Sequence, residues 1–292
     1  MGVTSIGDGK FIYYDPMRID AHQHFWELDR FTYAWMPPPP SCLRRNFLPE
    51  DLEPILAERR FDGTVLVQAH THLDETRWFL ELASQYAFIK GVVGWADLPG
   101  SNLGKALDEF QQHRKFKGIR HPVHDEADDE WLLRPNVLAG LKELARRGIP
   151  YDLLLRPQHL RLVPRVAEAV PDLRMVIDHI AKPLIAEHLM DGWARDMESA
   201  AAIPQVYCKI SGMITEADHS WWSAEDLRPY VAHVLAVFGP DRLMFGSDWP
   251  VCLLAGSWKR VLAAFTQAVG PLPGPVRDKL LGDTARSFYK LQ

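Results

Sequence analysis

The chain has 292 residues, of which 47% are hydrophobic, and this is enough to build one large buried core. Its 33 basic and 38 acidic residues give a formal net charge of -5 with no long run of either sign, which argues against nucleic acid and anionic membranes as partners. There is no apolar signal core at the N-terminus, and no stretch approaches the ~18 apolar residues that a membrane span needs. The three scattered cysteines do not form a disulfide framework. We therefore expect a cytoplasmic protein with a single domain over residues 1–292.

Short β-branched or continuously apolar runs recur along the chain, as expected for strands that are buried on both faces. Amphipathic segments with helical character lie between them. The predicted strands are Met17 to His22, Gly63 to Ala69, Ile89 to Ala96, Phe116 to His121, Pro150 to Arg156, Arg174 to Asp178, Gln205 to Ile210 and Arg242 to Gly246. The predicted helices include Glu50 to Arg60, Leu73 to Gln85, Asn136 to Arg147, Gln158 to Ala169 and Ala224 to Phe238.

This alternation predicts an α/β protein built as a (β/α)8 barrel, because about eight strand-helix units in one chain are typical of that fold. An open doubly wound sheet would more often carry a glycine-rich phosphate loop after its first strand. Neither a GxGxxG nor a GxxxxGK[ST] sequence is present, so nucleotide and dinucleotide chemistry lose their main support. The irregular segment 27–46 combines four consecutive prolines with three aromatic residues, and we interpret it as a long first βα loop that covers the barrel mouth.

Barrel enzymes keep their chemistry at the carboxyl ends of the strands. His22 and His24 follow the first predicted strand and point the same way, because strand residues two apart share a face. Asp248 follows the last predicted strand, and the closure of a barrel makes the first and last strands neighbours. A carboxylate beside imidazoles is a good general base for water, so the three residues predict a hydrolytic site.

Other strand ends contribute polar side chains to the same rim. Arg120 and His121 end the fourth predicted strand and could hold an anionic or hydroxylated substrate, although Arg120 could equally pair with Asp125 or Glu126. His179 and Lys182 lie in the turn after the sixth strand. Further candidates are Asp178, which could orient a neighbouring side chain, and Lys209, Ser211 and Gly212 at the end of the seventh strand.

Taken together, these motifs resemble the amidohydrolase superfamily, in its branch of sugar-lactone and aromatic-acid lactone hydrolases. The resemblance runs from about Arg18 to Tyr289. It rests on His22-Gln23-His24, Asp178-His179-Ile180-Ala181-Lys182-Pro183, Gly246-Ser247-Asp248-Trp249-Pro250, Gly118-Ile119-Arg120-His121 and Tyr151-Asp152-Leu153-Leu154. It implies a distorted (β/α)8 TIM barrel that hydrolyses a sugar lactone such as L-fuconolactone or L-rhamnonolactone. It also implies that Asp248 activates water and that His22, His24 and His179 surround the carbonyl.

The metal content expected from this resemblance is at most one ion. Binuclear members carry a bridging lysine or glutamate after the fourth strand and a histidine after the fifth, whereas this chain has Arg120-His121 and Arg156-Pro157 there. One divalent ion such as Zn²⁺ could still be held by His22, His24, His179 and Asp248. We expect no required cofactor, because a lactone carbonyl is electrophilic enough to be polarised by hydrogen bonds.

In the mechanism that follows, Asp248 deprotonates water, and the three histidines stabilise the oxyanion. The remaining candidates bind substrate: Arg120, His121, Tyr151, Arg156, Lys182, Trp26 and Trp249, of which the two tryptophans could instead be core residues. Two alternatives remain at this point. The first is a Zn²⁺-dependent decarboxylase of an aromatic or unsaturated acid on the same barrel, and the second is a sugar-acid binding protein without catalysis. The oligomeric state stays open.

Overall fold

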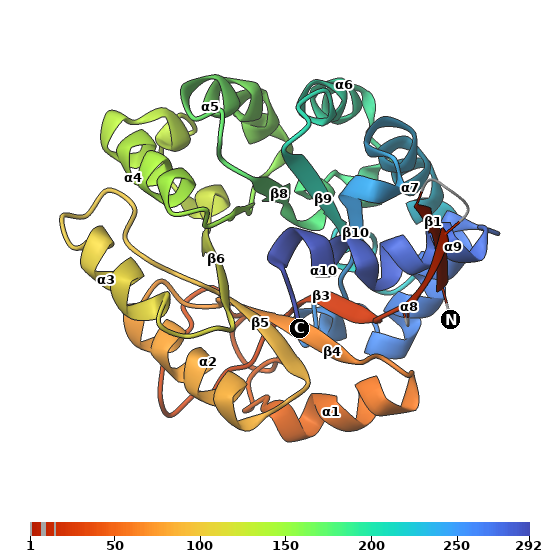
Figure 1. The fold of residues 1–292 in the computed structure, drawn as a ribbon. Coiled ribbons are helices and arrows are strands. Elements are labelled where there is room, and N and C mark those ends of the chain that lie inside the picture. Colours follow the sequence, from red (N-terminus) through yellow and green to blue (C-terminus); the bar gives the residue numbers. More distant parts are fainter. Residues whose placement is uncertain (1, 7–9, 15) are drawn as a thin grey trace.

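Eight parallel strands form a nearly closed barrel in the computed structural model, which describes residues 2–6, 10–14 and 16–292. Figure 1 looks along the barrel axis, with the helices arranged around the strands. The strands follow one another in chain order around the sheet. They are β3 (Ile19–Gln23), β4 (Gly63–Val67), β5 (Ile89–Gly94), β6 (Phe116–His121), β7 (Tyr151–Leu153), β8 (Met175–Ile177), β9 (Val206–Ile210) and β10 (Leu243–Phe245). All eight predicted strands are confirmed.

The helices that follow these strands cover the outside of the barrel (Figure 1). They are α1 (Pro49–Glu58), α2 (Leu73–Gln85), α3 (Leu103–Phe110), α4 (Pro135–Arg146), α5 (Val163–Ala169), α6 (Asp191–Ala201), α7 (Ala224–Phe238) and α8 (Trp258–Val269), followed by α9 (Gly274–Asp278) and α10 (Thr284–Tyr289). A separate antiparallel pair, β1 (Gly2–Ile6) and β2 (Lys10–Tyr14), precedes the barrel and was not predicted. The predicted (β/α)8 TIM barrel is confirmed.

One predicted helix is divided in the structure. The segment expected from Gln158 to Ala169 consists of a 3-10 helix, Pro157–Leu162, followed by α5. Pro164 lies in the first turn of α5. Because proline has no N–H to donate to the preceding turn, a continuous α-helix cannot pass through this position without losing a hydrogen bond.

The barrel closes between β10 and β3, and this closure is made by backbone bonds just beyond the last strand. The Asp248 N–H donates to the His22 carbonyl at 2.8 Å, and the His24 N–H donates to the Trp249 carbonyl at 2.7 Å. Asp20 on β3 fixes the same junction from below, since its carboxylate accepts from the Ser247 N–H at 2.8 Å and from the Ser247 hydroxyl at 2.5 Å. The two motifs from opposite ends of the chain are therefore held side by side.

The strand side chains divide the core into two parts, as the two-residue period of a strand requires. Outward-facing residues pack against the helices in one large apolar cluster. A smaller cluster fills the lower barrel interior and contains Val65, Val93 and Met244 together with Phe288 and Tyr289 of α10. Helix α10 lies across the centre of the barrel in Figure 1 and so covers the end of the barrel opposite the carboxyl ends of the strands. The site is consequently open only toward the carboxyl ends of the strands.

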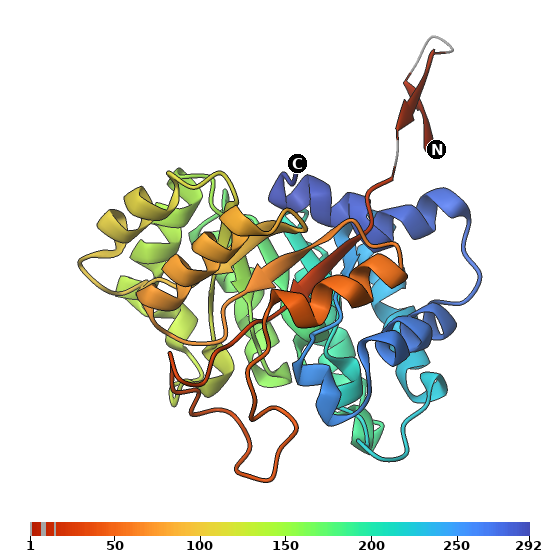
Figure 2. The same cartoon turned by 90° about the horizontal axis from the view of Figure 1, so that it is seen from below.

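The segment 27–46 leaves β3 at the opposite end from α10, as Figure 2 shows. Tyr33 of this segment is buried, whereas Trp35 is 41% exposed and is held by its indole N–H, which donates to the Ala69 carbonyl at 2.8 Å. Trp26 fixes the base of the segment by donating to the Arg45 carbonyl at 2.9 Å. No helix among the described residues is long and apolar enough to cross a membrane.

Candidate active site

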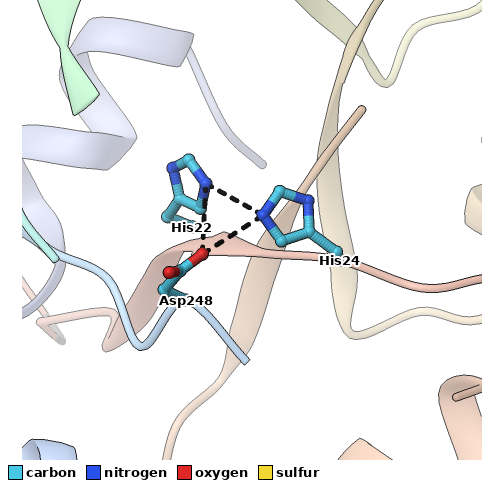
Figure 3. A group of neighbouring side chains, drawn as sticks. All are labelled: His22, His24 and Asp248. Carbon is cyan, nitrogen blue, oxygen red and sulfur yellow. Dashed lines mark hydrogen bonds and ion pairs between the residues drawn. The ribbon is translucent and has the colours of Figure 1, made fainter. Parts of the chain in front are cut away.

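His22, His24 and Asp248 meet at the carboxyl end of the closed barrel, as Figure 3 shows. The Nε2 atoms of the two histidines are 3.1 Å apart. Asp248 Oδ1 lies 3.3 Å from His24 Nε2 and 3.8 Å from His22 Nε2. His179 adds a fourth group, with its Nε2 atom 3.9 Å from the same carboxylate oxygen. We call these four residues the mouth cluster.

The backbone turns that carry Asp248 and His179 are left-handed. Asp248 has a φ of 56°, and four consecutive residues from His179 to Lys182 have positive φ values, including the β-branched Ile180 at 46°. Such conformations cost on the order of 1–3 kcal/mol each for residues other than glycine. The surrounding barrel imposes them, and they turn both side chains toward the mouth.

Hydrogen-bond partners assign the protons on two of the imidazoles. His24 Nδ1 lies 2.7 Å from the Val67 carbonyl, which can only accept, so His24 carries its proton on Nδ1 and has a lone pair on Nε2. His22 Nε2 lies 3.2 Å from Arg120 Nη1, which can only donate, so this nitrogen also presents a lone pair. The two Nε2 lone pairs and Asp248 Oδ1 thus converge, with the Arg120 guanidinium already donating to the His22 lone pair.

The three atoms are close enough together for a single Zn²⁺ ion to bind them, in competition with the contact from Arg120 to His22 Nε2. The point equidistant from the three atoms, which are 3.1, 3.3 and 3.8 Å apart, lies about 2.0 Å from each, within the usual range of zinc–nitrogen and zinc–oxygen bonds. His22, His24 and Asp248 are all buried and form one of the two candidate metal groups among the described residues. The other group is His22, Asp178 and His179.

Lys209 places its ammonium at the second of these groups. Its Nζ atom lies 2.6 Å from Asp152 Oδ2, 3.0 Å from Asp178 Oδ1 and 3.2 Å from His22 Nδ1. Tyr289 of α10 completes this arrangement by donating to Asp152 Oδ2 at 2.7 Å. We call Asp152, Asp178, Lys209 and Tyr289 the inner network. Because a fixed ammonium already neutralises these carboxylates, a second metal ion has no place here.

The charges of the two groups differ in how they are balanced. Burial by itself would raise the pKa of Asp178, but Lys209 and His22 hold it well below its ordinary value. Burial raises the pKa of Asp152 to about 6, against the opposing effect of Lys209. In the mouth cluster, burial acts to raise the pKa of Asp248, whereas His179 lowers it, and the net shift is downward.

Burial also controls the histidines of the mouth cluster. It lowers the pKa of His24 and lowers the pKa values of His22 and His179 well below the ordinary histidine value, although nearby carboxylates act in the opposite direction. The imidazoles are therefore neutral at pH 7, and Asp248 is ionised. This combination of an ionised carboxylate and neutral imidazoles is suited to proton transfer from water.

A cavity of about 670 Å³ lies above the mouth cluster, a size typical of small-molecule sites. Four of the residues predicted to bind substrate line it: Arg120, His121, Arg156 and Lys182. The structure does not bring the other three there, because Tyr151, Trp26 and Trp249 are buried in the large apolar cluster. Trp26 and Trp249 instead pack edge-on against Phe47.

Arg120 is buried and fully engaged. Its Nη1 atom donates to Asp178 Oδ2 at 3.0 Å and its Nε atom to Gln68 Oε1 at 2.8 Å. The pairing considered from the sequence, with Asp125 or Glu126, is therefore not the one that forms. Those two carboxylates pair instead with the neighbouring histidines of the rim, His124 and His121.

Several residues of the site were missing from the predicted set. Gln68 directly follows β4 beside Arg120, and Trp35 and His70 line the cavity. Ser211, which the sequence indicated as a strand-end candidate without a role, follows β9 and contacts His179 Nδ1 at 3.0 Å. Gln68 and Ser211 share a signal that the sequence does carry, a polar residue at the carboxyl end of an apolar strand. Trp35 carries no such signal, because its place depends on how the long loop folds back.

The chain is similar to known proteins over almost its full length. The sequence model of the amidohydrolase family matches residues 19–291. The chain belongs to the amidohydrolase family. This amidohydrolase is 38% identical over 281 residues to an L-fucono-1,5-lactonase of Burkholderia ambifaria, which covers 94% of this chain and 96% of the relative. The resemblance inferred from the sequence motifs is thereby confirmed.

Solved structures of the family agree with the fold. An amidohydrolase from Burkholderia multivorans with bound zinc has a TM-score of 0.88 at 36% identity, covering 94% of this chain and 100% of that one. A probable 2-pyrone-4,6-dicarboxylic acid hydrolase from Acinetobacter baumannii has a TM-score of 0.77 at 17% identity, covering 94% of this chain and 99% of that one. The second likeness bears on the fold alone.

Proposed function

We propose that this amidohydrolase opens the ring ester of a sugar lactone, such as L-fuconolactone or L-rhamnonolactone, to give the aldonic acid. The observation that carries the proposal is the Asp248 carboxylate, buried beside His24 and His179 at the floor of a cavity. The L-fucono-1,5-lactonase relatives, at 37–38% identity over 94% of the chain, support the substrate class.

In the proposed reaction, Asp248 takes a proton from water as the water oxygen bonds to the lactone carbonyl carbon. His179 faces the carbonyl oxygen and stabilises the negative charge that develops there. The bond from that carbon to the ring oxygen then breaks. The proton taken up by Asp248 passes to the leaving alkoxide, so the carboxylate is regenerated and the product is a hydroxy acid.

The fit of the mouth cluster to one divalent ion defines a second role for its residues. His22, His24 and Asp248 would hold the ion, and the ion would polarise the carbonyl as a Lewis acid when bound. We propose that hydrolysis does not depend on it, because a lactone carbonyl is more electrophilic than an amide and His179 already faces it. Asp248 remains the group that accepts the proton in either case.

The charges around the cavity favour a neutral, hydroxyl-rich lactone over a dicarboxylated one. Arg120 is neutralised by Asp178, and Lys182 Nζ is paired with Glu216 Oε1 at 2.6 Å. Arg156 makes a long bond of 3.4 Å to a backbone carbonyl and remains exposed at the rim. Paired cations can exchange hydrogen bonds with hydroxyl groups but offer little net charge to a second carboxylate.

The test is a pH-indicator assay of purified protein with a panel of aldonolactones and one dicarboxylated pyrone lactone, each with and without a chelator. We expect proton release from aldonolactones that persists with the chelator and is lost in Asp248→Asn. Activity that disappears with the chelator and returns with Zn²⁺ would contradict metal independence. The absence of turnover on every lactone would contradict the proposed function and would direct attention to carboxylic acids as substrates for decarboxylation.

A further inference from the structure

His179 lies between a serine hydroxyl and the cavity. Its Nδ1 atom is 3.0 Å from the Ser211 hydroxyl, and its backbone N–H donates to the same oxygen at 3.3 Å. Its Nε2 atom lies on the other side of the ring, 3.9 Å from Asp248 Oδ1, and His179 lines the cavity. Because a neutral imidazole carries a single ring proton, the protonation of Nε2 depends on whether Nδ1 donates or accepts a hydrogen bond.

The Ser211 hydroxyl has one proton to donate, and its partners determine where that proton goes. A backbone N–H can only donate, so the oxygen accepts from the His179 backbone. Ser211 is buried, and among the described residues its only other recorded hydrogen-bond partner is His179 Nδ1. A buried hydroxyl proton without an acceptor is unfavourable, so the hydroxyl donates to Nδ1.

From this geometry we infer that Ser211 is a positioning residue that holds His179 in the tautomer with its proton on Nε2. The inference rests on the proposed function only for the use made of that proton, which is a hydrogen bond to the lactone carbonyl oxygen. It also separates His179 from the other histidines of the mouth cluster. His22 and His24 present lone pairs, whereas the protonated Nε2 of His179 cannot ligate a metal ion.

The chain around Ser211 is shaped to keep the contact. Gly212 has a φ of 60°, in the left-handed region, and a Cβ atom at this position would clash with the His179 ring. The imidazole consequently lies directly against the backbone after β9. His179 itself has a φ of 54°. The turn at His179 and the turn at Gly212 therefore both hold the backbone that positions the imidazole beside Ser211.

The first test reads the tautomer directly, by NMR of protein labelled with ¹³C and ¹⁵N in histidine. The His179 signal is assigned by its loss in His179→Asn. We expect the Nε2–H tautomer in the unmodified protein, a shift toward the Nδ1–H tautomer in Ser211→Ala, and recovery in Ser211→Thr, which keeps the hydroxyl. An Nδ1–H signal in the unmodified protein, or an unchanged signal in Ser211→Ala, would overturn the inference.

A matched control is available on the outside of the barrel. The Ser84 hydroxyl on α2 lies 2.8 Å from the His113 Nε2 atom, so Ser84→Ala removes a second serine-histidine contact away from the cavity. We expect this variant to leave the His179 signal and the lactone turnover unchanged. Since the unmodified protein alone reports the resting tautomer, the inference can be contradicted even if Ser211→Ala does not fold.

The second test measures the consequence for catalysis. Loss of a hydrogen-bond donor to an oxyanion lowers kcat by about 10²-fold or more. We expect Ser211→Ala to lower kcat on the best aldonolactone by about that factor with little change in KM, and Ser211→Thr to recover most of it. A tautomer shift without loss of kcat would overturn the catalytic use of the proton. If the unmodified protein opens no lactone, the proposed function fails while the NMR result still decides the role of Ser211.

Discussion

The inner network and the mouth cluster are neighbours inside one barrel, but they treat buried charge in opposite ways. In the inner network, Lys209 lies within 3.0 Å of both Asp152 and Asp178, and each carboxylate is neutralised by a cation from the chain itself. In the mouth cluster, two imidazole nitrogens and the Asp248 carboxylate converge within 3.8 Å, and among the described residues Asp248 has no lysine or arginine ion-pair partner, while Arg120 reaches His22 Nε2 alone.

The difference shows how the same residue types serve structure or chemistry. Removing one partner of a paired buried charge is strongly destabilising, because it leaves the other charge buried and uncompensated. Converging acceptors are unfavourable in the resting protein, and they gain free energy when a proton or a cation arrives. His22 connects the two groups, since its Nδ1 atom faces Asp178 and its Nε2 atom faces the mouth. The following predictions test this contrast.

The largest expected effect is on catalysis in the mouth cluster. Asp248→Asn removes the general base, and we expect kcat to fall by about 10²- to 10⁴-fold, the usual contribution of general acid–base catalysis. The free energy of unfolding should not decrease, because the amide relieves the repulsion among converging acceptors. Initial rates on an aldonolactone and urea denaturation measure the two quantities. A variant that is both inactive and clearly less stable would contradict the contrast.

The next effect concerns the stability of the inner network. Lys209→Met leaves the Asp152 carboxylate buried without its cation and leaves Asp178 with Arg120 alone, and breaking a buried pair in this way costs about 3–5 kcal/mol. Urea denaturation measures the loss. The matched control is Lys259→Met, which removes a partly exposed ammonium that pairs with Glu58 at 2.6 Å on the surface. The control should have the stability of the unmodified protein, and equal losses in both variants would contradict the prediction.

The third prediction concerns Glu75, a buried carboxyl group that, unlike Asp178, is not paired with a lysine among the described residues. Burial raises the pKa of Glu75 to about 8 from its ordinary 4.5, although the backbone N–H groups of His70 and Ala69 donate to it. A raised pKa gives a contribution to stability that is fully present below pH 4.5 and is lost as the pH rises through about 8.

The free energy of unfolding should decrease between pH 5 and 9 in the unmodified protein, and in Glu75→Gln this decrease should be smaller by a few kcal/mol. Denaturation curves across this range measure it. Glu81→Gln, on the exposed side of the same helix, serves as the control and should keep the pH dependence of the unmodified protein. A Glu75→Gln variant with an unchanged pH dependence would show that the carboxyl group ionises below this range.

The smallest expected effect is at the loop over the mouth. Trp35→Phe removes the hydrogen bond from the indole to the Ala69 carbonyl, which is worth about 0.5–1.5 kcal/mol. We expect KM for the aldonolactone to rise about two- to tenfold with kcat little changed, since the loop borders the cavity and does not contribute a reacting group. Trp221→Phe replaces an indole that is 86% exposed and should leave KM unchanged. A fall in kcat alone would contradict this account of the loop.

The sequence predicted the frame of the site well because that frame depends on local patterns. Apolar runs predicted every strand of the barrel, and strand ends carry the chemistry in this fold. The placement of His22, His24 and Asp248 at one mouth follows from barrel closure alone. Tyr151 was predicted to bind substrate but does not line the cavity, because successive residues of a strand face opposite sides. It begins β7 and packs in the large apolar cluster, while the next residue, Asp152, faces the interior.

The amino-acid sequence by itself determined the barrel, its open end and the residue types available there, because these follow from hydrophobic periodicity and chain order. Only the tertiary structure decided which polar atoms meet. Lys209 lies on β9 and Asp178 directly follows β8, and their pairing within the barrel depends on the register of these two strands. The positions of the histidine protons depend on the same contacts. In a neutral imidazole one nitrogen donates and the other accepts, and the atom that each nitrogen faces decides which is which.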